Sequence, residues 1–208
     1  MRAAGAACAE QVADFKETDM FKLTLFTALL TTACVATSEP DVGSAAQAIG
    51  EDACPAGVPG TLAPNADQDL AFGLDAVGVQ KYVCNSAGAW AFVAPEADLS
   101  HNGQTFIHHY AGPTWEWLDG STVVGARVAG ASVDSTAIPW LLLRGASHGA
   151  IEGKLSEITA IQRLSTTGGN APAGACTPGA TIDVPYTALY LFYRTKTDHP
   201  ENNTRCGA

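Results

Sequence analysis

The chain has 208 residues, only 15% of them charged, and a formal net charge of -10 with a pI near 4.7. An acidic surface without a run of Lys or Arg repels phosphate backbones, which argues against nucleic acid and anionic membrane surfaces as partners. The 21 Gly and 11 Pro residues favour strands joined by tight turns over long, charged surface helices.

Residues 20–33 have the pattern of a signal peptide. Met20-Phe21-Lys22 carries one positive charge, a short apolar stretch follows, and small residues lead to Ala33. The stretch is too short to span a bilayer as a helix. The sequence therefore predicts export to the cell envelope or secretion.

Cys34 directly follows this segment and resembles the lipidated cysteine of a bacterial lipoprotein. Lipidation there would tether the protein to a membrane. Thr31 departs from the Leu or Val that such a site usually has, so ordinary cleavage near Ala36 or after Ala48 stays open as the alternative.

The remaining chain is expected to divide into three further parts. Residues 1–19 carry several acidic side chains ahead of the apolar stretch, and we interpret them as a mis-called extension before a true start at Met20. Residues 35–52 are typical of a flexible tether. Residues 53–208 suit one β-rich domain with a sizeable core.

Four cysteines fall in that domain: Cys54, Cys84, Cys176 and Cys206. An even number in an exported domain indicates two disulfides. No pair has the Cys-x-x-Cys spacing of a zinc site, and three pairings are open.

Short apolar segments separated by turn signals fill the domain and predict an all-β fold, a sandwich or barrel with short strands and long loops. The segments are 70–74, 79–84, 89–93, 105–111, 114–117, 122–129, 139–143, 155–164 and 186–193.

Three of these segments carry more detail. Pro139–Leu143 is continuously apolar, as a strand buried on both faces would be. Tyr186–Tyr193 alternates, with Tyr186, Ala188, Tyr190 and Phe192 on one side and Leu189, Leu191 and Tyr193 on the other. Residues 155–164 fit a helical stripe or a strand, and we predict a strand.

A long ordered series of motifs runs through the domain and resembles one known family. The motifs are Gly78-Val79-Gln80-x-Tyr82-x-Cys84, Trp90-x-Phe92, Ala94-Pro95-Glu96-Ala97-x-Leu99, His109-Tyr110-Ala111-Gly112-Pro113-Thr114-Trp115-Glu116, Asp119-Gly120-Ser121, Ala137-Ile138-Pro139-Trp140-Leu141-Leu142-Leu143, Ile161-Gln162-Arg163, Gly168-Gly169, Ala171-Pro172, Cys176 and Val184-Pro185-Tyr186-Thr187-Ala188. The series resembles the family called domain of unknown function 3455, found in exported bacterial proteins and in fungi and plants. The resemblance covers roughly residues 58 to 194.

This resemblance implies a disulfide pairing but no activity. Typical members carry cysteines that match Cys84 and Cys176, which implies that these two pair and that Cys54 pairs with Cys206. The long-range bridge would contribute roughly 4 kcal/mol in the chain-entropy model. Some relatives are labelled malate dehydrogenase, but the chain has neither a Gly-x-Gly-x-x-Gly turn nor alternating strands and helices, so we expect no cofactor.

The richest polar cluster is His108, His109, Glu116 and Asp119. Such groups can bind a metal or perform acid–base chemistry. Strand alternation places His109 opposite to His108, and a turn at Gly112-Pro113 would bring His109 near Glu116. The alternative, which we favour, is that these groups satisfy turn backbone beneath aromatic packing; we assign no catalytic residue and no metal site.

Other ligand-binding candidates are aromatic or cationic. Tyr110, Trp115 and Trp140 are candidates for a platform that holds a sugar or another flat ligand, although core packing is the commoner role. Arg163 lies in an apolar stretch and would need a partner if buried. A salt bridge to Glu116 or Asp119 and an anion-binding role fit this position equally.

The segment Gly145-Ala146-Ser147-His148-Gly149 matches the Gly-x-Ser-x-Gly nucleophile elbow. No strand–helix units precede it, so we interpret the match as chance. Taken together, the sequence favours an exported binding or structural module. The first alternative is an exported enzyme that uses His109 with Glu116 or Asp119 in one pocket, and a Ser147 hydrolase is a distant third.

Overall fold

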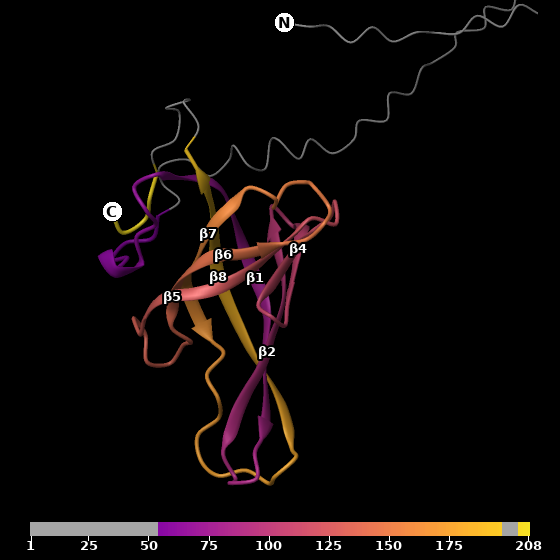
Figure 1. Cartoon of the computed structure of the whole chain (residues 1–208). Helices are drawn as coiled ribbons and strands as arrows, with labels where there is room; N and C mark the ends of the chain where they lie inside the picture. The colour runs from indigo at the N-terminus through magenta and orange to yellow at the C-terminus, as the bar shows by residue number, and fades with distance from the viewer. Residues whose placement is uncertain (1–53, 197–203) are drawn as a thin grey trace, which may run out of the picture. The chain divides into compact units, whose positions relative to one another are not determined.

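Strands with alternating inward and outward side chains dominate the described chain, which in this computed structural model comprises residues 54–196 and 204–208 (Figure 1). A short 3-10 turn, η2 (Gly60–Leu62), precedes them. The strands are β1 (Gln68–Cys84), β2 (Trp90–His101), β3 (Gln104–Tyr110), β4 (Thr114–Trp117), β5 (Thr122–Ala131), β6 (Trp140–His148), β7 (Ile158–Gly168) and β8 (Thr181–Thr195). Each strand pairs antiparallel with the next, and β8 returns to β1 to close a barrel.

The all-β prediction is therefore confirmed, in its barrel form. Among the residues that the structure describes, no helix is long and apolar enough to cross a membrane. The expected extension, signal segment, Cys34 and tether lie outside the described residues.

The barrel interior holds one of two hydrophobic cores. On β8 the inner set is Tyr186, Ala188, Tyr190 and Phe192, as the alternation predicts. The interior packs tightly because Phe72 of β1 stacks on Phe192, with 4.7 Å between ring centroids.

The second core lies on the outer face of the barrel, where β8 contributes Leu189, Leu191 and Tyr193. The segment around η2 and the C-terminal Cys206 pack there. Gln162 ties them together: its Nε2 donates to the carbonyls of Leu62 (2.6 Å) and Cys206 (3.0 Å), and its Oε1 accepts from the Tyr193 hydroxyl at 2.6 Å. A disulfide joins Cys54 to Cys206.

This outer cover explains why β6 begins with a continuously apolar stretch. Trp140 and Leu142 belong to the outer core and Leu143 to the inner core, so both faces are buried as predicted. The prediction of a strand within residues 155–164 is also confirmed: β7 begins at Ile158, and Leu155 lies buried in the turn before it.

β1 is one strand of 17 residues, where the sequence predicted two segments flanking Gly78. The glycine does not break the strand. Its missing side chain lets β2 pass close by, because a Cβ at Gly78 would collide with the backbone of Glu96 and Ala97. Pro95 is tolerated in β2 because β3 pairs with β2 only from Ala97 onward.

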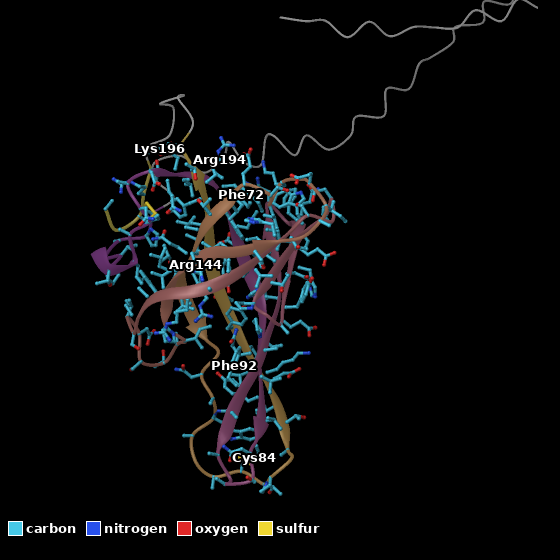
Figure 2. All side chains as sticks on the ribbon, viewed as in Figure 1. Phe72, Cys84, Phe92, Arg144, Arg194 and Lys196 are labelled. Carbon is cyan, nitrogen blue, oxygen red and sulfur yellow. A yellow bond between two sulfur atoms is a disulfide. The ribbon has the colours of Figure 1, made fainter. Side chains whose placement is uncertain are left out.

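Three strands extend past the barrel as a stalk, which we define as residues 79–84 of β1, 90–95 of β2 and 181–185 of β8. The stalk points downward in Figure 1. A disulfide joins Cys84, labelled at the tip of the stalk in Figure 2, to Cys176 in the loop before β8. Both disulfide pairings that the family resemblance implied are thus confirmed.

Candidate functional site

A pocket of about 600 Å³ opens at the stalk end of the barrel. The stalk supplies one wall, the β3–β4 turn at Gly112-Pro113 and the Ile138-Pro139 connection line it, and the barrel interior closes it. The aromatic and aliphatic lining includes Tyr82, Phe92, Val93, Trp115, Leu141, Leu143 and Tyr190. The polar lining is Gln80, His109, Arg127 and Arg163, and none of the described residues around the pocket is Asp or Glu.

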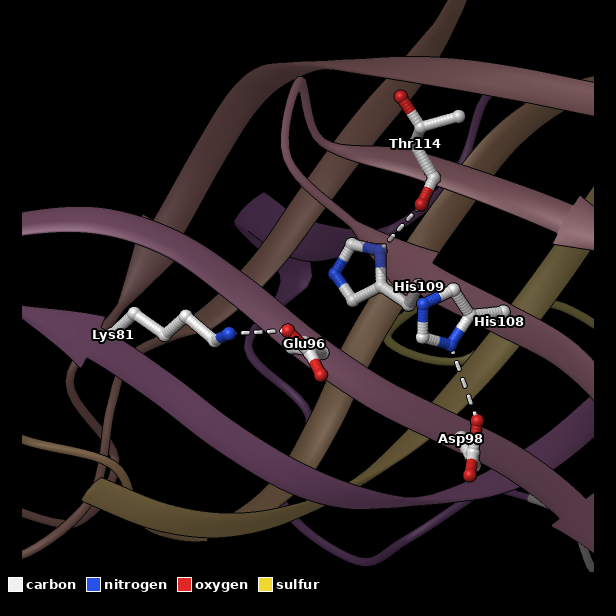
Figure 3. Close-up of polar contacts among 6 residues, drawn as sticks. All are labelled: Lys81, Glu96, Asp98, His108, His109 and Thr114. Atoms are coloured by element: carbon white, nitrogen blue, oxygen red, sulfur yellow. Dashed lines mark hydrogen bonds and ion pairs between the residues drawn. The ribbon is translucent and has the colours of Figure 1, made fainter. Parts of the chain in front are cut away.

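His109 lies in the pocket wall with only 2% of its surface exposed. Its ring stacks on Trp115, with 4.3 Å between centroids and 7° between planes. Its Nδ1 donates to the Thr114 carbonyl at 2.8 Å (Figure 3). Because a carbonyl only accepts, Nδ1 carries the proton in the neutral ring and Nε2 keeps its lone pair.

Burial, together with the smaller effect of the nearby positive charge of Arg163, lowers the pKa of His109 to about 3, against the opposing effect of the Thr114 hydrogen bond. The ring is therefore neutral at neutral pH. Its Nε2 is an acceptor at the pocket wall but a weak base.

Arg163 reaches the pocket from β7 and is half-buried. Its Nε and Nη2 donate to the Pro139 carbonyl at 3.2 and 2.9 Å. Its charge also acts on Tyr190, whose pKa is raised by burial and lowered in part by Arg163. Neither Glu116 nor Asp119 supplies the salt bridge considered for Arg163, and no ion pair involves Arg163 within the described part of the chain.

The other members of the predicted polar cluster face away from the pocket. In the β3–β4 hairpin His109 pairs with Trp115, and His108 pairs with Glu116, so Glu116 shares the outer face with His108. The Tyr110 hydroxyl donates to Glu116 Oε2 at 2.9 Å. The proximity of His109 and Glu116 that the enzyme alternative requires is therefore not found, because the hairpin register places them on opposite faces.

The opposite orientation of the two histidines is confirmed. His108 is exposed, and its Nδ1 lies 3.2 Å from Asp98 Oδ1 (Figure 3). Its ring lies 5.5 Å from that of Tyr110. Lys81 and Glu96 form a separate ion pair in the same view.

Asp119 lies at the other end of the barrel, in the β4–β5 turn. Its carboxylate accepts from the backbone N–H groups of Ser121 and Lys154, both at 2.8 Å. The Lys154 ammonium in turn lies over the rings of Phe72 and Trp117, 5.4 and 5.8 Å from their centroids. Asp119 thus joins two loops that cover this end.

Two further predicted residues have positions unrelated to the pocket. Trp140 is 7% exposed and packs in the outer core, not beside Trp115 and Tyr110. Ser147 is exposed within strand β6, whereas a nucleophile elbow sits at a strand-to-helix turn. Among the described residues, no group of three or more His, Cys, Asp or Glu side chains is placed to hold a metal ion.

The structure therefore brings together three of the predicted residues, His109, Trp115 and Arg163. Sequence reasoning missed Gln80 and Arg127 as pocket residues. A usable signal existed for Gln80: it is a polar residue in phase with the inward positions Phe72, Leu74 and Ala76 of β1.

Two polar groups of the pocket residues have no hydrogen-bond partner. Trp115 Nε1 is buried without one, and so is Gln80 Nε2. The Gln80 amide lies close enough to the Tyr186 hydroxyl to lower the pKa of Tyr186 in part. The contact does not have the geometry of a hydrogen bond, so Gln80 Nε2 stays without a partner. A buried donor without a partner reduces the stability of the fold. Core packing alone therefore does not explain why these two donors are present in the pocket residues.

The two disulfides indicate an oxidising, extracellular environment.

Comparison with known proteins identifies a family. No curated protein matches the chain. No solved structure matches it either. The family model described as "Protein of unknown function (DUF3455)" matches residues 64–194, which is more than half of the sequence. The chain therefore belongs to the DUF3455 family.

Proposed function

We propose that this protein is a binding module that holds a small molecule in the pocket at the stalk end of its barrel. The observation that carries the proposal is the pocket itself. Its volume of about 600 Å³ lies within the range of about 300–1,000 Å³ that is typical of small-molecule sites. Apolar walls with a few polar groups, here Gln80, His109 and Arg163, are also typical of such sites.

The acid–base alternative lacks its second group. It needs His109 and a carboxylate in one cleft, but Glu116 lies on the outer face and Asp119 ties two loops at the far end. A pKa of about 3 also makes His109 a poor proton acceptor at neutral pH. Binding without chemistry requires neither property.

The protein is proposed to act in the cell envelope, exported by the segment before Cys34 and anchored by a lipid on that cysteine. The signal-like sequence and the two disulfides support this placement. The mass of the mature protein tests it. A diacylated N-terminal Cys34 is expected, and a free N-terminus beyond Cys34 would rule the anchor out.

A thermal-shift screen of metabolites and glycans tests the binding function, because a bound ligand raises the melting temperature by mass action. The pocket is then blocked by Leu141→Trp, with Leu118→Trp as the matched control. Leu118 is 68% exposed in the β4–β5 turn, away from the pocket. Hits should lose their shift only in Leu141→Trp; no hits, or hits indifferent to that variant, would refute the proposal.

A further inference from the structure

We infer that the pocket recognises an organic acid, whose anionic group binds Arg163 and Arg127 and whose aromatic or branched apolar body lies against the aromatic wall. This inference rests on the proposed binding function and names the class of ligand.

The charge of Arg163 is the first reason. A guanidinium removed from water loses hydration energy, and an anionic partner normally compensates for it. Arg163 is half-buried, yet two of its N–H groups go to a neutral carbonyl, that of Pro139. Arg163 also interacts with the Tyr190 hydroxyl, another neutral group. The positive charge has no carboxylate partner within the described part of the chain.

Arg127 of β5 brings a second positive charge to the same pocket. Its guanidinium folds over Gly130, where an added Cβ would lie 2.6 Å from Arg127 Nη2 and 2.9 Å from Leu141 Cδ2. The glycine thus makes room for the guanidinium beside Leu141, itself a pocket residue. In the described part of the chain Arg127 likewise forms no ion pair.

The two arginines give the pocket a sign opposite to that of the whole chain. The protein has a formal net charge of -10, but Arg127 and Arg163 are the charged side chains around the pocket. Two guanidinium groups without a carboxylate provide charge-assisted hydrogen bonds to an anion and exclude a cation.

The wall opposite the arginines requires an apolar body. Phe92 and Val93 of the stalk line the pocket while 55% and 56% exposed, and Figure 2 shows Phe92 on the stalk side. The Phe92 ring meets Tyr82 edge to face, with 5.8 Å between centroids. Large exposed side chains at a pocket wall gain most from a ligand that covers them, so an inorganic anion leaves this surface unused.

Two fluorescent probes that share an anilinonaphthalene body separate charge from shape: anilinonaphthalene sulfonate is anionic, and phenyl-naphthylamine is neutral. We expect the purified protein to bind the sulfonate roughly tenfold more tightly than the neutral probe. Arg163→Met should reduce this preference, since only Arg127 remains, and should leave the neutral probe unaffected. Arg144→Met is the matched control, because Arg144 is exposed on β6 outside the pocket (Figure 2).

Competition on the unaltered protein tests the inference without a variant. Naphthoate should displace the bound sulfonate at a lower concentration than naphthalenemethanol, which has the same ring system but no charge. Equal binding of both probes, or equal displacement by both competitors, overturns the organic-acid inference and leaves the binding function standing. Failure of both probes to bind overturns the two together.

Discussion

The buried histidine should make the barrel sensitive to acid over a defined pH range. His109 has a pKa of about 3 in the folded protein and an ordinary value of 6.5 when exposed, so between these values the unfolded chain binds a proton that the folded chain does not. Stability therefore falls as the pH falls from about 6.5 towards 3. From pH 7.5 to pH 4.5 the loss due to His109 amounts to about 3 kcal/mol.

Urea unfolding of the wild type and of His109→Asn at several pH values isolates this contribution. The Asn side chain can keep a donor near the Thr114 carbonyl but does not titrate. We expect the variant to be less stable than the wild type at pH 7.5, because it loses the stack on Trp115, and to lose about 3 kcal/mol less on acidification. Carboxylates titrate in both proteins, so the difference between the two curves reports His109.

The matched control is His108→Asn, which removes an exposed ring from the opposite face of the same strand and leaves His109 in place. It must retain the wild-type difference between pH 7.5 and pH 4.5. Parallel curves for the wild type and His109→Asn would show that the ring is hydrated or charged in the folded protein, and the assignment of a neutral His109 would then be wrong.

Three further changes test other parts of the structure by urea unfolding. Gly145→Ala should cost about 1–3 kcal/mol, because a Cβ there collides with a backbone carbonyl at the start of β7, whereas Ser147→Ala should change stability by less than about 0.5 kcal/mol; the reverse order would mean that the serine has a role. Gln80→Met should raise stability by about 1 kcal/mol while weakening ligand binding, and a loss of stability would show that its amide is satisfied. Replacing Cys54 and Cys206 by Ser should cost about 4 kcal/mol, since the other bridge already spans 92 of the 152 residues and leaves about 60 to close; an unchanged midpoint would contradict this.

Much of the fold could be predicted because its signals are local. The alternation from Tyr186 to Tyr193 identifies both faces of β8, and the unbroken apolar stretch at Pro139–Leu143 indicates burial on both sides. The length of β1 could not be read in this way. Gly78 suggests a turn in isolation, and only the close passage of β2 explains it as part of a strand.

The site was harder to predict because it depends on the register of neighbouring strands. A register one residue different would have placed Glu116 beside His109, and alternation along each strand cannot choose between the two. Arg163 was recognised as needing a partner, but it lines the same pocket as Arg127 because β5 and β7 pair with opposite edges of β6. Spacing in the sequence does not give the registers of these two pairings.

The seam between the first and last strands also bears on how the protein folds. β1 and β8 pair from Gln68 with Thr195 through Val83 with Thr181, so the longest ladder joins the two ends of the barrel sequence. Such non-local pairing is slow, because loop-closure entropy is lost before the contacts form. A ribosome must release nearly the whole domain before this ladder can form, so the nascent polypeptide stays without its closed barrel until synthesis of β8 is complete.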